Sequence, residues 1–220
     1  IKLGKGFNKI NIKQNKLTCG AGVLDSTLSK FALKNSISNL EFYSGIPGTI
    51  GGAVKMNAGC FGYETKDVIK DARVINRLGE EKILKIKDLN LRYRNSSINN
   101  NTIVQEVNFK AIKGDLEKIK LNIKKILDSR LATQPLKTKT SGSTFKNPKG
   151  FFAAKLIEQS ECSKLQIGDA VVSNKHCNFL INLNKAKSQD IENLGEEIRS
   201  RVYKKFNILL EWEVKIIGDK

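Results

Sequence analysis

The chain has 220 residues, enough to bury a substantial core in one large domain or two modest ones. Its hydrophobic fraction of 40% is typical of soluble globular proteins, and no apolar run approaches the roughly 20 residues that span a bilayer. The formal net charge of +17 is compatible with nucleic-acid binding, with a solvated Lys-rich surface or with an anionic small substrate. The cations are spread along the chain without an Arg-rich tract or an aromatic-interleaved basic patch, which argues against nucleic acid.

The cysteines and the histidine argue against a metal site. The cysteines are far apart and form no CxxC pair, whereas zinc sites and disulfide frameworks need closer spacing. They are Cys19, Cys60, Cys162 and Cys177. The first residues carry no long apolar stretch typical of a signal peptide, so a cytoplasmic protein with reduced thiols is expected. His176 is the only histidine and is expected to be structural.

The first half of the chain is predicted to begin with strands and turns over 1–23, where Ile10 and Ile12 alternate with polar residues. Asp25 is predicted to cap a helix that runs to about Lys34. A glycine-rich stretch and three strand-like runs follow, at 44–62, 68–75, 81–86 and 103–109.

The second half is predicted to begin with a helix capped by Asp115, and a domain boundary is expected between Asp115 and Pro135. The apolar stripe of this helix is Leu116, Ile119, Ile123, Ile126 and Leu127. Ser188 is predicted to cap a long helix with one apolar face. A short helix and two strands complete the prediction, at 151–159, 179–183 and 209–217. Because strands and helices mix without a regular βαβ rhythm, the α+β class is favoured.

The glycine-rich stretch Ser44–Gly59 reads SGIPGTIGGAVKMNAG. Glycines let backbone N–H groups approach a ligand closely, and Pro47 stiffens the chain, so a rigid loop against a flat or phosphorylated cofactor is predicted. A plain surface loop is the alternative. The stretch matches neither a Walker A loop nor a dinucleotide fingerprint. A second candidate, Gly4-Lys5-Gly6, lacks the third glycine and a following helix, and is predicted to be a strand-turn.

Six motifs, in family order over nearly the whole chain, resemble the UDP-N-acetylenolpyruvoylglucosamine reductases. They are GIPGTIGGAVKMNAGCFG at 45–62, LRYRNS at 91–96, RLATQP at 130–135, TSGSTFKNP at 140–148, VVSNKHCNFLIN at 171–182 and LEWEVKIIG at 210–218. The resemblance implies an incomplete FAD-binding domain of the PCMH/vanillyl-alcohol-oxidase kind and a substrate domain. The implied segments are the FAD domain at 1–115, a connecting helix at 116–134, the substrate domain at 135–208 and a returning strand at 209–220.

The resemblance implies a reaction in two halves. NADPH reduces FAD, and the reduced flavin passes hydride to the enolpyruvyl group of UDP-N-acetylglucosamine enolpyruvate, which gives UDP-N-acetylmuramate for peptidoglycan. The charge left beside the substrate carboxylate then needs stabilisation and a proton. A monomeric bacterial cytoplasmic enzyme acting on a small UDP-sugar is expected, with no nucleic-acid or membrane partner.

The resemblance also implies three catalytic residues. Arg94 matches the family's catalytic arginine, and a guanidinium suits a carboxylate because it stays charged and binds with two N–H groups. Ser143 matches the proton donor, a weak acid that its neighbours must tune. Glu213 matches the catalytic glutamate. Outside the motifs, the three would be interpreted as a surface arginine, a turn serine and an exposed strand carboxylate.

The remaining site residues are implied by the same motifs. The cofactor set is Gly45, Ile46, Pro47, Gly48, Thr49, Gly51, Gly52, Ala53, Asn57 and Gly59. The substrate set is Tyr93, Gln134, Lys146 and Asn147, with Asn147 expected at the uridine nucleotide. The family's Gly-x-Gly-Ser-Asn diphosphate loop has no match, so the front of the FAD domain is expected to be missing. Three rivals remain: another flavoenzyme of the same fold, a basic nucleic-acid-binding protein and a non-catalytic reductase remnant.

Overall fold

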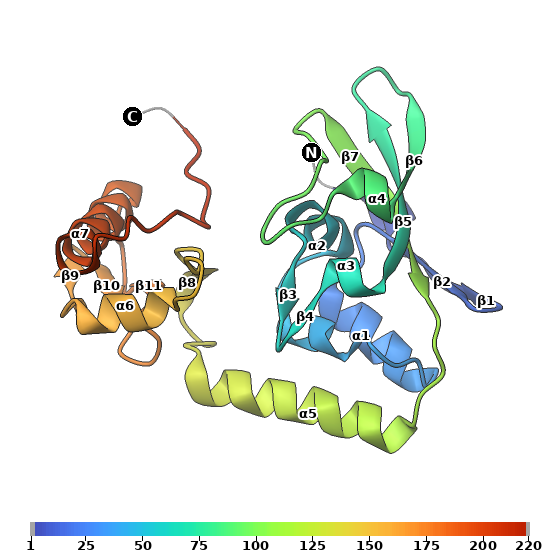
Figure 1. Cartoon of the computed structure of the whole chain (residues 1–220), viewed down its shortest axis with the longest axis horizontal. Helices are drawn as coiled ribbons and strands as arrows, with labels where there is room; N and C mark the ends of the chain where they lie inside the picture. The colour runs from blue at the N-terminus through green and yellow to red at the C-terminus, as the bar shows by residue number, and fades with distance from the viewer. Residues whose placement is uncertain (1–2, 219–220) are drawn as a thin grey trace. The chain divides into compact units, whose positions relative to one another are not determined.

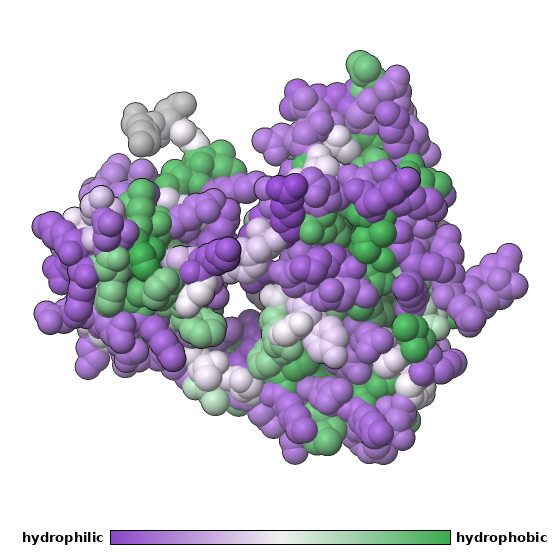
Figure 2. All heavy atoms as spheres, viewed as in Figure 1, coloured by the Kyte–Doolittle hydropathy of each residue, from purple (hydrophilic) through white to green (hydrophobic). Residues whose placement is uncertain are grey.

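The computed structural model describes residues 3–218, which form two compact units that divide after Ser129 (Figure 1). Residues 1–2 and 219–220, at the outer ends of the predicted first and last segments, lie outside the described part. No helix within 3–218 is long and apolar enough to cross a membrane. The face in view is mostly hydrophilic, with hydrophobic residues in small groups (Figure 2).

The first unit is built on an antiparallel sheet with the strand order β1-β2-β7-β5-β6. The strands are β1 (Ile10–Lys13), β2 (Lys16–Gly20), β5 (Ile69–Asn76), β6 (Glu81–Lys85) and β7 (Thr102–Lys110). The long β7 lies at the centre and directs Val104, Val107 and Phe109 into the core. The predicted strand-like runs in this part of the chain are therefore confirmed.

Short helices and a small hairpin complete the first unit. They are η1 (Lys5–Phe7), α1 (Asp25–Lys34), η2 (Glu41–Gly45), α2 (Ile50–Met56), β3 (Gly59–Cys60), β4 (Tyr63–Glu64), α3 (Thr65–Val68) and α4 (Ile86–Leu89). Their apolar residues pack with the inner face of the sheet, and Leu28, Tyr43 and Ile50 are fully buried there. The segment Gly4-Lys5-Gly6, predicted as a strand-turn, is instead part of the 3-10 turn η1. The N–H of Phe7 donates to the carbonyl of Gly4 (3.1 Å) and stabilises this turn.

The start of α1 corrects one prediction. Leu24, with extended backbone angles, is the N-cap, while Asp25 is the first helical residue and is buried. The backbone N–H of Asp25 donates to the carbonyl of Gly48 (3.1 Å). The helix therefore begins where the chain pairs with the glycine-rich stretch, rather than at a side-chain cap.

Helix α5 (Leu116–Thr133) begins as predicted, because the Asp115 carboxylate accepts a hydrogen bond from the Lys118 N–H (2.8 Å). Only part of its apolar stripe is buried. Ile119 and Ile126 are buried, whereas Leu116 and Leu127 remain exposed. The chain divides into its two units within this helix.

The second unit has an antiparallel sheet of order β8-β11-β10-β9 with two helices. Its elements are β8 (Lys139–Ser143), α6 (Ala153–Gln159), β9 (Gln166–Ile167), β10 (Ala170–Val172), β11 (Phe179–Asn182) and α7 (Ser188–Phe206). Leu194, Ile198 and Val202 form the buried face of α7, as the helical spacing predicts.

Two predictions about the second unit are wrong. The N-cap of α7 is Lys187, whose N–H donates to Asp190 (2.9 Å), and not Ser188. Residues 209–217 do not form a strand and join the unit through an isolated bridge between Phe145 and Trp212. The segment instead lies against α7 and the stretch Thr144–Lys146 without joining the sheet.

Candidate active site

The glycine-rich stretch is a turn followed by a helix, which corrects the prediction of a loop throughout. Gly48 has φ +146°, a conformation that favours glycine, and a Cβ there would lie 3.2 Å from Oδ2 of Asp25. Helix α2 follows at once. The N–H of Ile50 donates to Val23 O and that of Gly51 to Ala21 O, each at 2.9 Å. These bonds fix the stretch against the segment that follows β2.

A cavity of about 620 Å³ opens beside this stretch, within the first unit. Thr49, Gly51 and Gly52 of the predicted cofactor set line it. Lys55, which was not among the predicted site residues, lies one helical turn further along α2 and also lines the cavity. The rest of the lining consists of residues 98–100 and 102–104, together with Leu3, Asn8, Ala21, Gly22 and Leu24. The cavity has the size range typical of small-molecule sites.

Arg94 lies in a tight turn that is bound to the glycine-rich stretch. The turn is closed by a bridge between Arg92 and Asn95, and Arg94 itself has φ +51°. Its guanidinium donates to the carbonyl of Gly59 (3.3 Å) and lies 4.9 Å from the ring centroid of Tyr93. The turn therefore brings Arg94 beside the end of the predicted cofactor set.

Two side-chain hydrogen bonds hold this turn in place. Asn57, fully buried, donates to the carbonyl of Arg92 (3.1 Å), and the Ser96 hydroxyl donates to the carbonyl of Lys55 (2.7 Å). Asn57 also donates to Glu64 (3.1 Å) and accepts from the N–H of Lys66 (2.9 Å). The Asn57 amide thus links the Arg94 turn to the segment of Glu64 and Lys66.

Ser143 lies in the second unit at the end of β8, paired with Phe179 of β11. The residues after it are fixed by Asn178, which is buried. Asn178 accepts hydrogen bonds at its backbone O from Thr144 (2.8 Å) and at its side chain from Phe145 N–H (2.9 Å), and its amide donates back to the Phe145 carbonyl (2.8 Å). Asn178 belongs to the motif at 171–182 but was not predicted to be a site residue.

Glu213 lies on the segment that pairs with Thr144, the residue after Ser143. Its N–H donates to the carbonyl of Thr144 (2.9 Å), and the N–H of Val214 reaches the same oxygen (3.3 Å). Glu213 and Ser143 are both partly buried. The structure therefore brings together two of the three predicted catalytic residues within one unit, while Arg94 belongs to the other unit.

The predicted substrate residues are divided in the same way. Tyr93, 44% exposed, belongs to the first unit, and the other three belong to the second. Lys146 forms an ion pair with Glu211. The side-chain carbonyl of Asn147 accepts the N–H of Ala153 (3.0 Å) at the start of α6, and Gln134 accepts from Arg130 (3.0 Å).

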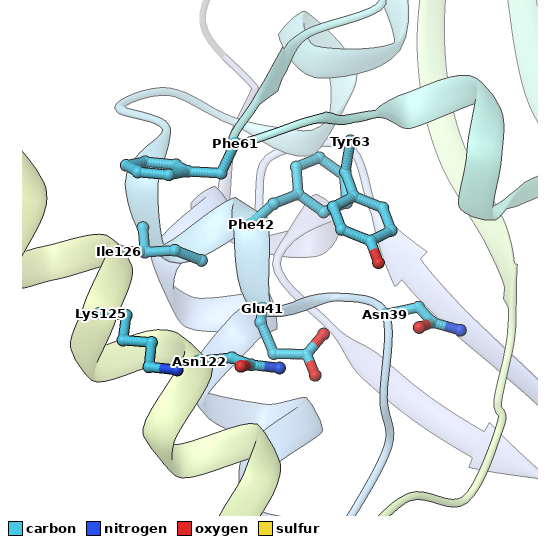
Figure 3. Close-up of a pocket in the computed structure, with 8 residues that line it drawn as sticks. All are labelled: Asn39, Glu41, Phe42, Phe61, Tyr63, Asn122, Lys125 and Ile126. Atoms are coloured by element: carbon cyan, nitrogen blue, oxygen red, sulfur yellow. The ribbon is translucent and has the colours of Figure 1, made fainter.

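A smaller cavity of about 280 Å³ lies between α5 and the β3–β4 hairpin (Figure 3). The rings of Phe42 and Tyr63 stack there with centroids 6.0 Å apart, and Phe61 extends toward Ile126. Asn39, Glu41, Asn122 and Lys125 add polar groups around them. None of the catalytic, cofactor or substrate residues predicted from the sequence lines this cavity.

Burial perturbs several titratable groups near these segments, among them Asp25 and His176. Burial raises the pKa of the Asp25 carboxyl to about 7, and neither of its oxygens has a hydrogen-bond partner among residues 3–218. Burial lowers the pKa of His176, whose ring meets Phe179 edge-on at 4.7 Å. Within 3–218 no group of three or more His, Cys, Asp or Glu residues could hold a metal ion.

Two protein-family models match the chain. One, described as an FAD binding domain, covers residues 1–85, and the other, described as the C-terminal domain of UDP-N-acetylenolpyruvoylglucosamine reductase, covers 134–217. Together with the fold, these matches define a flavoprotein oxidoreductase with an α+β FAD-binding domain followed by a second domain. The predicted fold class and the predicted FAD cofactor are confirmed.

Whole-chain relatives identify the family. The UDP-N-acetylenolpyruvoylglucosamine reductase of Parvibaculum lavamentivorans is 44% identical over 99% of this chain and 70% of its own length. That of Orientia tsutsugamushi strain Boryong is 44% identical over all of this chain and 74% of its own. The crystal structure of the Thermus caldophilus enzyme, 32% identical, superposes with a TM-score of 0.87 over 97% of this chain and 76% of that one. The chain belongs to the UDP-N-acetylenolpyruvoylglucosamine reductase family, as its motifs predicted.

Proposed function

We propose that this chain reduces UDP-N-acetylglucosamine enolpyruvate to UDP-N-acetylmuramate, with NADPH as the reductant and FAD as the cofactor, in peptidoglycan precursor synthesis. Similarity over the whole chain to bacterial reductases of this name supports the reaction. The backbone pairing of Glu213 with Thr144, next to Ser143, is the observation that carries the proposal. It gives the second unit a carboxylate and a hydroxyl on adjoining segments.

The large cavity of the first unit fits a flavin nucleotide. Gly51 and Gly52 leave backbone open to a flat ligand, while Thr49, Lys55 and Asn8 offer polar groups around it. The other members of the predicted cofactor set do not line this cavity and are proposed to shape or support it. Gly45, Ile46, Pro47 and Gly48 shape the turn before α2, Ala53 is buried within α2, and Asn57 and Gly59 support the Arg94 turn. Bound FAD would supply the hydride that the enolpyruvyl double bond accepts.

The proposed roles of the three catalytic residues follow from the charge that the reaction creates. A hydride added to the terminal carbon of the enolpyruvyl group leaves negative charge beside its carboxylate. Arg94 stabilises this charge, since a guanidinium stays cationic throughout. Ser143 gives its hydroxyl proton to the carbon beside the carboxylate. Glu213 completes the proton-transfer site on the segment that faces Ser143.

The four substrate residues are proposed to hold the nucleotide part of the substrate. Lys146 offers a cation and Asn147 an amide, groups that suit a phosphate and a pyrimidine ring respectively. Gln134 and Tyr93 are proposed to add hydrogen bonds. We further propose that the enzyme acts as a cytoplasmic monomer on this small UDP-sugar, without a nucleic-acid partner.

The proposed proton donor is tested by Ser143→Ala in the chain reconstituted with FAD. NADPH should reduce the bound flavin at the parent rate, whereas oxidation of the reduced flavin by substrate should slow by about 10²–10⁴-fold because the proton donor is lost. Stopped-flow absorbance of the flavin measures both steps separately. Equal rates for parent and variant in the second step would rule out Ser143 as the donor.

A further inference from the structure

Trp212, the residue before Glu213, fits against α7 only because position 195 has no side chain. A Cβ on Gly195 would lie 2.0 Å from Cη2 and 2.6 Å from Cζ2 of the Trp212 ring. Atoms cannot approach so closely, and the ring is a rigid plane rather than the end of a flexible chain. Gly195, in the buried face of α7, thus forms the seat of the Trp212 ring.

The ring is also fixed from its other sides. Its indole N–H donates to Glu196 of α7 (3.0 Å), and Glu196 is itself bound by Arg199 (2.6 and 2.7 Å). Arg199 also donates to the carbonyl of Leu210 (2.9 Å), which is buried. The segment that leads to Glu213 is therefore held to α7 by backbone and side chain together.

The opposite side of the ring lies against the segment that carries Ser143. The centroids of Trp212 and Phe145 are 4.9 Å apart, and the two residues also form a backbone bridge. Phe145 is held in turn by the Asn178 amide through two hydrogen bonds. Trp212 consequently spans the space between α7 and the Ser143–Phe145 segment.

Backbone hydrogen bonds also hold this segment: the N–H groups of Glu213 and Val214 donate to the carbonyl of Thr144 (2.9 and 3.3 Å), and the N–H of Lys146 donates to the carbonyl of Glu211 (2.9 Å). Residues 209–217 belong to no strand, and Figure 1 draws the chain after α7 as coil. We propose that Trp212, seated on Gly195, is a positioning residue that sets Glu213 against Ser143 and Thr144 for the proton transfer. This inference rests on the proposed role of Glu213, and it adds two residues, Gly195 and Trp212, that had no role predicted from the sequence.

The first test uses Gly195→Ala in the chain reconstituted with FAD. The added methyl group must displace the ring, so the substrate step should slow about 100-fold, as misplacement of a catalytic group by about 1 Å does. Flavin reduction by NADPH should stay at the parent rate. Ser200→Ala, an exposed position on the same helix, is the matched control and should change neither step. A Gly195→Ala protein as fast as the parent in the substrate step would contradict the proposal.

A second variant keeps the test decisive should Gly195→Ala fail to fold. Trp212→Leu removes the ring without creating a clash and should also slow the substrate step. In the Trp212→Leu background, Gly195→Ala should have little further effect, since no ring remains to be displaced. Full, independent slowing by the two substitutions would overturn the inference, as would a Trp212→Leu protein with the parent rate.

Glu213→Gln separates this inference from the proposed function. If Glu213→Gln leaves the substrate step unchanged, the proposed role of Glu213 is wrong. If Glu213→Gln slows that step, adding Gly195→Ala should change it little, because the group that Trp212 positions is already disabled. A further slowing of about 100-fold in the double variant would show that Trp212 does not act through Glu213, while the role of Glu213 would stand.

Discussion

Asp25 is the residue whose burial departs furthest from expectation for its type. Its side chain is 1% exposed, and the carboxyl oxygens have no partner among residues 3–218. Sequence reasoning assigned Asp25 to a helix cap, a role that its residue type favours at exposed helix starts. The pairing of Leu24 with Thr49 instead turns the start of α1 inward. That pairing joins segments far apart in the sequence, so no local pattern could predict it.

The raised pKa of Asp25 predicts a pH-dependent stability. In the folded chain the carboxyl stays protonated up to about pH 7, whereas in the unfolded chain it ionises near its ordinary pKa of 3.8. The contribution of Asp25 to the free energy of unfolding is therefore fully present below about pH 4 and is lost as the pH rises to about 7. The whole loss is on the order of 4 kcal/mol.

Asp25→Asn removes this contribution because the amide does not ionise. Urea unfolding of parent and variant at pH 5 and pH 7.5 should show a parent that loses more free energy of unfolding between the two values than the variant does. Groups common to both proteins cancel in this difference. Parallel pH dependences would mean that Asp25 titrates normally in the folded chain.

At the level of elements, the periodic ones were predictable and the glycine-rich ones were not. The stripe of α7 and the strands β5–β7 follow from spacing alone. Helix α2 did not, because glycine has a low helix propensity. Burial of Ile50, Ala53 and Val54 stabilises this helix in spite of its glycines, and burial is a tertiary effect.

The neighbouring glycines of α2 predict opposite effects on substitution. A Cβ on Gly51 would lie 3.0 Å from the Cβ of Ala21, whereas the nearest atom to one on Gly52 is Oγ1 of Thr49 at 3.7 Å. Gly51→Ala should therefore lower the free energy of unfolding. Gly52→Ala should leave it unchanged or raise it by about 0.5–1 kcal/mol, since alanine favours a helix.

The same pair tests the proposed FAD site. The Gly52 methyl would project into the cavity, so Gly52→Ala should weaken FAD binding by about tenfold or more, equivalent to about 1.4 kcal/mol. Quenching of flavin fluorescence on binding measures the affinity, and thermal unfolding of the same samples serves as the control. A Gly52→Ala protein with parent affinity would place FAD elsewhere.

For the whole molecule, the motifs predicted the family, which is confirmed, and three catalytic residues, which remain predictions. They did not predict which contacts position each of these side chains. Ser143 and Glu213 are distant in sequence and meet through Thr144. Trp212 adjoins Glu213, but the supports Asn178 and Gly195 come from two further places in the chain. Such supports depend on close contacts between distant segments. The spacing of residues within one segment therefore cannot predict them.

The net charge of +17 is an attribute of the whole molecule that is compatible with the proposed anionic substrate and requires no nucleic acid. An anionic UDP-sugar is attracted by a positive field, an effect that salt weakens.

Size-exclusion chromatography with light scattering should give a mass near the 24.5 kDa of one chain. A gel-shift with duplex DNA at physiological salt should show no complex. A tight complex, or a dimer mass, would contradict the proposal of a monomer that acts on a small substrate.

The reductase activity itself is tested most directly by the mass of the product. The chain, saturated with FAD, is mixed with NADPH and UDP-N-acetylglucosamine enolpyruvate, and the nucleotide sugar is analysed by mass spectrometry. The proposed reaction predicts a product heavier by two hydrogens, formed in step with the NADPH consumed. Unchanged nucleotide sugar, in a sample whose bound flavin NADPH reduces fully, would contradict it.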